Sequence, residues 1–139
     1  MTLDSNVLIA ALKKNEPYSK DCSEILGEVP DSFVLSEPSI AYQEVCGTLA
    51  RRVGSDVADE ARKRLDMIVH PSLIARCDRA FCISAYPLCS KFGIYAIDAI
   101  YLKVALDNRA VLVSLDKRDF TDRVKKSGVE AYHVSEFPY

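Results

Sequence analysis

The chain has 139 residues, of which 49% are hydrophobic and 27% are charged, and its formal net charge at pH 7 is −2. This length predicts a single domain, residues 1–139, whose core buries roughly two thirds of the surface that the unfolded chain exposes. The charge is not that of a protein that binds nucleic acid by positive charge alone, and the sequence has no run of roughly 20 apolar residues that could span a bilayer.

The first residues and the cysteines indicate the cellular setting. The start, MTLDSNVLIAAL, has an acid where a signal peptide has basic residues, and its apolar stretch is short, so we expect a cytoplasmic protein. The cysteines are odd in number and form no Cys-x-x-Cys pair, which argues against a disulfide framework and a tetrahedral zinc site. We expect them to be small core residues: Cys22, Cys46, Cys77, Cys82 and Cys89.

Hydrophobic periodicity and breakers predict alternating strands and helices along the chain. The expected strands cover residues 1–4, 32–36, 67–70, 110–114 and 130–134. The expected helices cover residues 5–14, 17–27, 38–53, 55–66, 77–92 with a kink or break at Pro87, 95–108 and 117–127. This alternation predicts an α/β domain with a parallel sheet covered by helices on both faces.

The helix predicted at 95–108 carries an acid on its apolar side. At 3.6 residues per turn, Asp98 is flanked by apolar and aromatic residues, whereas Lys103 and Asp107 fall on the opposite side. Burying a lone ionised carboxylate costs a free energy of roughly several kcal/mol, unless the group is protonated, paired with a cation or bound to a metal. Asp98 is therefore a candidate functional residue.

Two further acids lie at expected strand ends. Asp4 follows the first strand, and Asp116 follows the strand AVLVS, at the edge where ligands collect in open α/β sheets. Either acid could instead cap the helix that follows it. Asp119 and Asp122 lie in the first turn of the next helix, where acids favour the helix dipole.

A fourth acid, Glu44, lies beside the apolar stripe of the helix predicted at 38–53, next to Gly47. An exposed glutamate paired with a nearby arginine is the alternative. It is improbable, however, that all four acids have only such ordinary roles. We therefore expect Asp4, Glu44, Asp98 and Asp116 to converge, and a ligand set of oxygen alone suits Mg²⁺ or Mn²⁺ better than zinc.

The order of these acids resembles that of a known family. With LDSNVLIA near the start, YAIDAIYLKVA near the end and LVSLDKRDF after it, the sequence is similar to the PIN domain, especially to VapC-type toxins of toxin–antitoxin pairs. The resemblance spans nearly the whole chain. It implies a three-layer α/β/α domain with a central, mainly parallel sheet of four or five strands, and a Mg²⁺- or Mn²⁺-dependent endoribonuclease.

The resemblance also implies roles for individual residues. Asp4, Glu44, Asp98 and Asp116 match the acidic set, which would bind the metal and act in catalysis. Ser5, Asn6 and Ser114 occupy polar positions that would support the carboxylates. Many relatives place a further Asp two residues after the last acid, whereas Arg118 stands there in this chain, so that Asp119 is a doubtful ligand.

The expected reaction is hydrolysis of an RNA phosphodiester by metal-activated water. Lys117 and Arg118 are candidate phosphate contacts, with solvated surface charge as the alternative. Two other functions stay open: a non-catalytic RNA- or protein-binding module of the same fold, and a phosphatase that uses Asp4 as nucleophile.

The expected partners follow from the resemblance. They are an RNA substrate, a second copy of the chain in a homodimer and a small antitoxin, with no membrane. The candidates for exposed apolar surface at a dimer interface are Tyr18, Ile25, Leu26, Val53 and Val57.

Overall fold

The computed structural model describes residues 1–13 and 15–138 of the chain. Its strands are β1 (Thr2–Leu3), β2 (Glu37–Pro38), β3 (Ile74–Ala75), β4 (Leu112–Ser114) and β5 (Ala131–His133). Its α-helices are α1 (Ser5–Leu12), α2 (Ser19–Gly27), α3 (Ile40–Arg52), α4 (Ser55–Ile68), α5 (Arg79–Ala85), α6 (Pro87–Phe92), α7 (Ala96–Asn108) and α8 (Arg118–Lys125). Two 3₁₀ turns, η1 (Pro71–Leu73) and η2 (Val134–Glu136), complete the described elements.

The strands form two parallel sheets. The first has the order β1-β4-β5 and the second pairs β2 with β3, which confirms the predicted α/β class with parallel strands. The segment before β2 lies beside β1, because the Ser36 amide donates to the Met1 carbonyl at 2.9 Å. At the next step, the Leu3 amide donates to the Glu37 side chain at 2.8 Å instead of to a backbone carbonyl. A side chain thus continues the contact between the two sheets.

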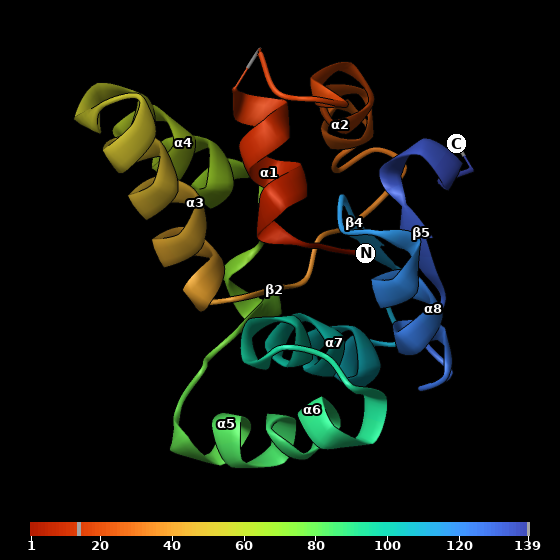
Figure 1. Ribbon diagram of the computed structural model, residues 1–139. Helices are drawn as coiled ribbons and strands as arrows, with labels where there is room; N and C mark the ends of the chain where they lie inside the picture. Colours follow the sequence, from red (N-terminus) through yellow and green to blue (C-terminus); the bar gives the residue numbers. More distant parts are fainter. Residues whose placement is uncertain (14, 139) are drawn as a thin grey trace.

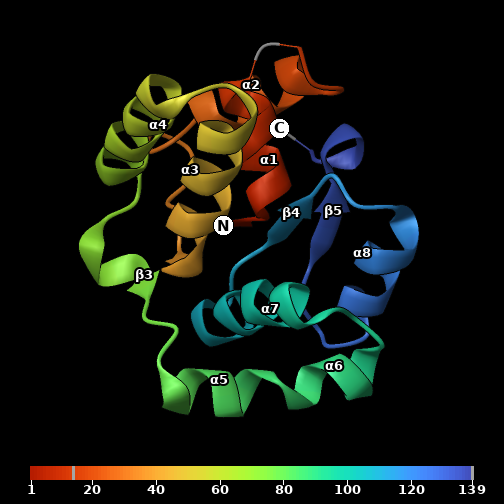
Figure 2. The ribbon, with the colours of Figure 1, turned by 60° about the vertical axis from the view of Figure 1, so that its left-hand side comes forward.

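Helices cover both faces of the central strands. Leu112 packs with α7 and α8, whereas the next residue, Val113, packs with the core of α1 to α4, because successive strand residues point to opposite faces. Figure 1 shows α1 to α4 on one side of the strands and α5 to α7 on the other, with α8 beside them. Figure 2 shows α5 and α6 beyond α7, at the outer edge of the domain. The result is the predicted three-layer arrangement, although the described strands form a sheet of three and a separate pair instead of one central sheet of four or five.

Three local predictions are corrected. The strand expected at 67–70 is wrong, because α4 continues to Ile68 and the strand forms later, at Ile74–Ala75. The strand expected at 32–36 is displaced to Glu37–Pro38. Of the cysteines, all free, only Cys22 is fully buried, since the others lie on helices or loops nearer the surface. The break at Pro87 is confirmed, because α6 begins there.

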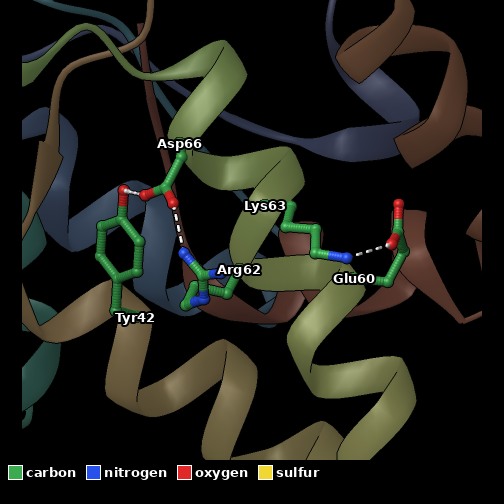
Figure 3. A network of polar contacts seen from close by, with 5 residues as sticks. All are labelled: Tyr42, Glu60, Arg62, Lys63 and Asp66. Carbon is green, nitrogen blue, oxygen red and sulfur yellow. Dashed lines mark hydrogen bonds and ion pairs between the residues drawn. The ribbon is translucent and has the colours of Figure 1, made fainter.

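The helix that carries Glu44 is held against α4 by both core packing and polar contacts. In Figure 3 the Tyr42 hydroxyl of α3 donates to Asp66 of α4 at 2.8 Å, and Arg62 donates to the other oxygen of Asp66 at 2.7 Å. Lys63 and Glu60 form another pair within α4, 3.6 Å apart, and point away from Tyr42. Exposed ion pairs within one helix contribute at most about 1 kcal/mol each, and of these contacts the Tyr42–Asp66 bond is the one that joins the two helices.

Within the described residues no single helix has both the length and the apolar composition to cross a membrane; only the bent pair made by residues 79–92 and 96–108 passes that test when taken together.

Candidate active site

The ends of β1 and β4 bring together three of the predicted residues. Asp4 follows β1 directly, and its amide donates to the Val113 carbonyl of β4 at 2.9 Å. Its carboxylate accepts a hydrogen bond from the Ser114 hydroxyl at 2.7 Å, and the same hydroxyl accepts from the Asp116 amide at 2.9 Å. Asp4 begins α1 without a side-chain capping bond, so its carboxylate is turned to the neighbouring strand and not to its own helix.

Asn6 joins the same two strand ends from the side of α1. Its amide nitrogen donates to Asp116 Oδ1 at 3.1 Å, and its side-chain oxygen accepts from the Leu115 amide at 3.1 Å. Both interactions cross 109 or 110 residues of sequence. Ser5 is half-buried, and its hydroxyl forms no hydrogen bond to any part of the chain that the structure describes. Asn6 and Ser114 thus lie where the sequence places supporting polar groups, whereas Ser5 makes no such contact.

Asp98 lies in the first turn of α7 and is half-buried. Its Oδ2 accepts a hydrogen bond from the Tyr95 amide at 3.3 Å, which fixes the carboxylate at the helix N-terminus. Asp98 and Asp116 line the same cavity, of about 450 Å³. Asp98 therefore faces this cavity from one wall while Asp116 faces it from the end of β4.

Glu44 reaches the cluster from α3. It is half-buried, and its Oε2 accepts a hydrogen bond of 2.7 Å from the hydroxyl of Tyr101, which is fully buried on α7. This contact joins α3 to α7 through two residues that are 57 positions apart in sequence. Tyr101 is a residue that sequence reasoning did not assign to the site; its only signal was its place on the same helix as Asp98, three residues later.

The electrostatics show that the four acids share one neighbourhood. Burial raises the pKa of Asp4 to about 7; the Ser114 hydrogen bond opposes the rise, and the charges of Asp116, Asp98 and Glu44 add to it. Burial also raises the pKa of Asp98 to about 6, with Asp116 and Glu44 adding and the Tyr95 amide opposing. The carboxyls of Asp4 and Asp98 are thus easier to protonate than in water, mainly because burial disfavours their charged forms and in addition because neighbouring carboxylates repel that charge.

A fifth acid, Glu37, was missed by the sequence analysis. It is fully buried, its Oε2 has no hydrogen-bond partner among the described residues, and burial raises its pKa well above the usual range. Asp4 contributes to this rise, so Glu37 lies close enough to the cluster for its charge to be disfavoured by Asp4. Its position before Pro38, at an expected strand end, was the signal that could have drawn attention to it.

The basic residues after β4 have different surroundings. Lys117 lines the cavity and is exposed, with no ion-pair partner in residues 1–13 and 15–138. Arg118 forms an ion pair with Glu136 and is not among the described residues that line the cavity. Asp119 is exposed at the cavity edge and pairs with Arg123 at 2.7 Å, while Arg123 also donates to the Gly93 carbonyl. The geometry therefore favours Lys117 and Arg123 over Arg118 as cations that face the cavity.

The donor set fits a hard divalent cation in its chemistry. Asp4, Glu44, Asp98 and Asp116 supply oxygen atoms alone, and their mutual repulsion is relieved by a positive ion. As they stand, no group of three or more His, Cys, Asp or Glu side chains among the described residues is placed to hold a metal ion. The four carboxyls are thus near enough to influence one another but do not form a finished ligand cage.

Comparison with known proteins places this site in context. The family model of the PIN domain matches residues 1–126. The fold is similar to that of VapC20 of Mycobacterium tuberculosis, a toxin that cleaves the sarcin–ricin loop, with a TM-score of 0.70 and 15% identity over 87% of this chain and 92% of that one. No curated protein matches the sequence significantly.

Two complexes have similar chains. FitAcB from Neisseria gonorrhoeae gives a TM-score of 0.65 with 17% identity, and the match covers 98% of this chain and 99% of that one. VapBC2 from Rickettsia felis, bound to a DNA fragment from its promoter, gives a TM-score of 0.67 with 12% identity over 95% and 96% of the two chains. At these identities the likeness concerns the fold.

Proposed function

The chain belongs to the PIN domain family, whose members are generally nucleases, and from this premise we propose that it is a Mg²⁺- or Mn²⁺-dependent endoribonuclease. The observation that carries the proposal is the shared electrostatic neighbourhood of four carboxyls from β1, α3, α7 and the end of β4. Such a cluster is costly for folding alone, so its presence is best explained by a cation that it binds.

In this proposal Asp4, Glu44, Asp98 and Asp116 hold the metal. A bound Mg²⁺ or Mn²⁺ supplies a water of lowered pKa and neutralises charge on a phosphate. The chain's own groups orient the carboxylates: Ser114 holds Asp4, Asn6 holds Asp116, Tyr101 holds Glu44 and the Tyr95 amide holds Asp98. Lys117 offers a cation to an RNA phosphate at the cavity, whereas Asp119 is exposed at the cavity edge beside Arg123 and is at most an additional ligand.

The phosphatase alternative has less support. Asp4 is only 6% exposed and its carboxylate is engaged by Ser114, whereas a nucleophile must reach a phosphorus atom. A non-catalytic module of the same fold would keep the core but would have no use for the buried acids. Detection of an aspartyl-phosphate, or RNA binding without cleavage in any metal, would favour these alternatives.

The decisive experiment compares two matched substitutions in the purified protein. Asp98→Asn removes one cavity carboxylate, whereas Asp122→Asn makes the same chemical change at an exposed position of α8. With single-stranded RNA and Mg²⁺ or Mn²⁺, we expect cleavage by the wild type and by Asp122→Asn, none by Asp98→Asn, and a mild loss for Asp119→Asn. EDTA should abolish cleavage and excess Mg²⁺ should restore it; cleavage by Asp98→Asn at the wild-type rate would refute the assignment.

We further propose that the protein is the toxin of a toxin–antitoxin pair in the cytoplasm and that it forms a homodimer. The support for this proposal is the likeness in fold to the toxin VapC20 and to chains in FitAcB and VapBC2. Of the apolar residues expected at an interface, Tyr18, Val53 and Val57 are exposed, whereas Ile25 and Leu26 are buried in the core and are not available. Light scattering that gives only monomer at high micromolar concentration would reject the dimer.

A further inference from the structure

The cavity beside Asp98 and Asp116 has an aromatic rim that the proposed chemistry does not use. Tyr95 lines the cavity and is 85% exposed, the highest exposure among the large apolar and aromatic residues of the described chain. An aromatic side chain is usually at least half-buried, because its large apolar surface is unfavourable in water. The ring of Tyr95 is therefore available to a ligand that enters the cavity.

Helix formation does not explain a tyrosine at this position. Tyr95 is the N-cap residue of α7, where Ser, Thr, Asp and Asn are strongly preferred because their short side chains reach the backbone amides. What Tyr95 gives to the site is its backbone amide, which donates to Asp98 Oδ2 at 3.3 Å. Any residue except proline supplies this amide, so the contact with Asp98 does not depend on the ring.

The hydrogen bond from the Tyr95 amide also fixes the position from which the Tyr95 side chain extends. Because the Tyr95 amide is bonded to Asp98, the Cα atom that carries the ring is held next to a carboxylate of the proposed metal site. The floor of the same cavity is apolar, made in part by Ile94 and Phe120, which are 8% and 9% exposed. A planar apolar group that enters beside Asp98 would thus meet a floor below and a ring at the rim.

Two cations, Lys117 and Arg123, also line the cavity. Lys117 is exposed and has no acidic partner among the described residues. Arg123 is held in place by Asp119 and by the Gly93 carbonyl. A ligand with both a planar base and a phosphate matches this combination of an aromatic ring, an apolar floor and a cation.

We propose that Tyr95 is a stacking platform for an unpaired RNA base next to the scissile phosphate, with Lys117 in contact with a neighbouring phosphate. This inference rests on the proposed nuclease function and deepens it, because a platform of this kind selects single-stranded RNA: a base must be free of its helix to lie on a side chain. The selection is tolerant of sequence, since every base has a flat face.

The test is a binding cycle in the Asp116→Asn background, which keeps the RNA intact in Mg²⁺. Binding of a labelled single-stranded decamer is measured by fluorescence anisotropy, with an abasic site placed at each position in turn. At one position the abasic site should weaken binding about tenfold to a hundredfold, and Tyr95→Ala should weaken binding of the intact RNA to a similar extent. Tyr95→Ala combined with that abasic site should cost little more than either change alone.

Two controls separate stacking from other effects. Tyr95→Phe keeps the ring and should bind nearly as the parent does, while Tyr86→Ala removes another exposed tyrosine, 67% exposed and not among the described residues that line the cavity, and should have no effect. Because Tyr95 is exposed, its truncation should leave thermal unfolding unchanged, which is measured alongside.

The outcomes also separate this inference from the proposed function. If the losses from Tyr95→Ala and from the abasic sites are additive at every position, or if Tyr95→Ala binds RNA as the parent does, the platform is refuted, including in the case that the ring serves a protein partner. Cleavage by the wild type without this coupling would leave the nuclease standing and the platform rejected. Non-additive losses from Tyr95→Ala and one abasic site, without cleavage by the wild type in any metal, would support the platform and reject the nuclease.

Discussion

Replacing Asp4 by Asn should stabilise the metal-free protein, although the residue is buried and hydrogen-bonded. The carboxyl has a pKa of about 7 in the folded chain against 3.8 for an unperturbed Asp, mainly because burial disfavours its charge. Below pH 3.8 both states are protonated and stability is fully present. As the pH rises toward about 7 the unfolded chain releases the proton first, so stability falls, and above that pH the loss is complete.

The size of the effect follows from the shift. At about 1.36 kcal/mol per pKa unit, the ionised Asp4 costs at most about 4 kcal/mol at pH 8, and the amide of Asn removes this cost while its oxygen still accepts from Ser114. For a chain of 139 residues this corresponds to a rise of at most about 13 °C in Tm.

The assay is thermal unfolding in EDTA at pH 4 and at pH 8, with Asp122→Asn as the matched control. We expect Asp4→Asn to melt well above the wild type at pH 8 and close to it at pH 4, while the exposed control tracks the wild type at both. Equal melting temperatures of wild type and Asp4→Asn at pH 8, or a difference that is the same at both pH values, would refute the reasoning.

Mg²⁺ or Mn²⁺ should stabilise the wild type increasingly with concentration, by about 2.7 kcal/mol at a hundred times the dissociation constant, which corresponds to a rise of about 9 °C in Tm. Zinc should not be needed, and calorimetry that shows no shift of Tm at millimolar Mg²⁺ or Mn²⁺ would contradict this prediction. Tyr101→Phe should weaken Mn²⁺ binding by about tenfold or more in a titration, because Glu44 loses the donor that orients it, whereas Tyr42→Phe, which loses a bond to exposed Asp66, should not. Gly93→Ala should lower the free energy of unfolding by about 1 kcal/mol in urea, since Gly93 has φ +66° and a Cβ there would lie 3.1 Å from Arg123 Nη1; an unchanged midpoint would show that the loop adapts.

The parts of the fold that the sequence predicts well are those with a local cause. The helices follow from apolar periodicity, and the break at Pro87 follows from a ring that cannot continue the backbone ladder. The strand expected at 67–70 is not formed, because a short apolar run can belong to either a strand or a helix. Val69 is buried in the core of α1 to α4 as expected of an apolar residue, but it lies at the C-terminal end of α4 and not in a strand.

The candidate site divides in the same way. An acid after a strand is visible locally, so Asp4 and Asp116 could be placed at one edge from the sequence alone. The bond from Tyr101 to Glu44 and the side-chain contact from Glu37 to the Leu3 amide are tertiary, and no spacing in the sequence encodes them. The same holds for Ile25 and Leu26, whose burial depends on the helices that cover them.

The two hydrogen bonds of Asn6 restrict which amino acids can replace it at position 6. The side chain there must offer a donor to Asp116 and an acceptor to the Leu115 amide at the same reach. Aspartate keeps the acceptor but sets a further negative charge against a crowded group of acids, leucine offers neither atom, and glutamine is one methylene too long. A library randomised at this codon and selected for a folded, metal-binding chain should therefore return asparagine almost alone, while the neighbouring Ser5 should return many residues.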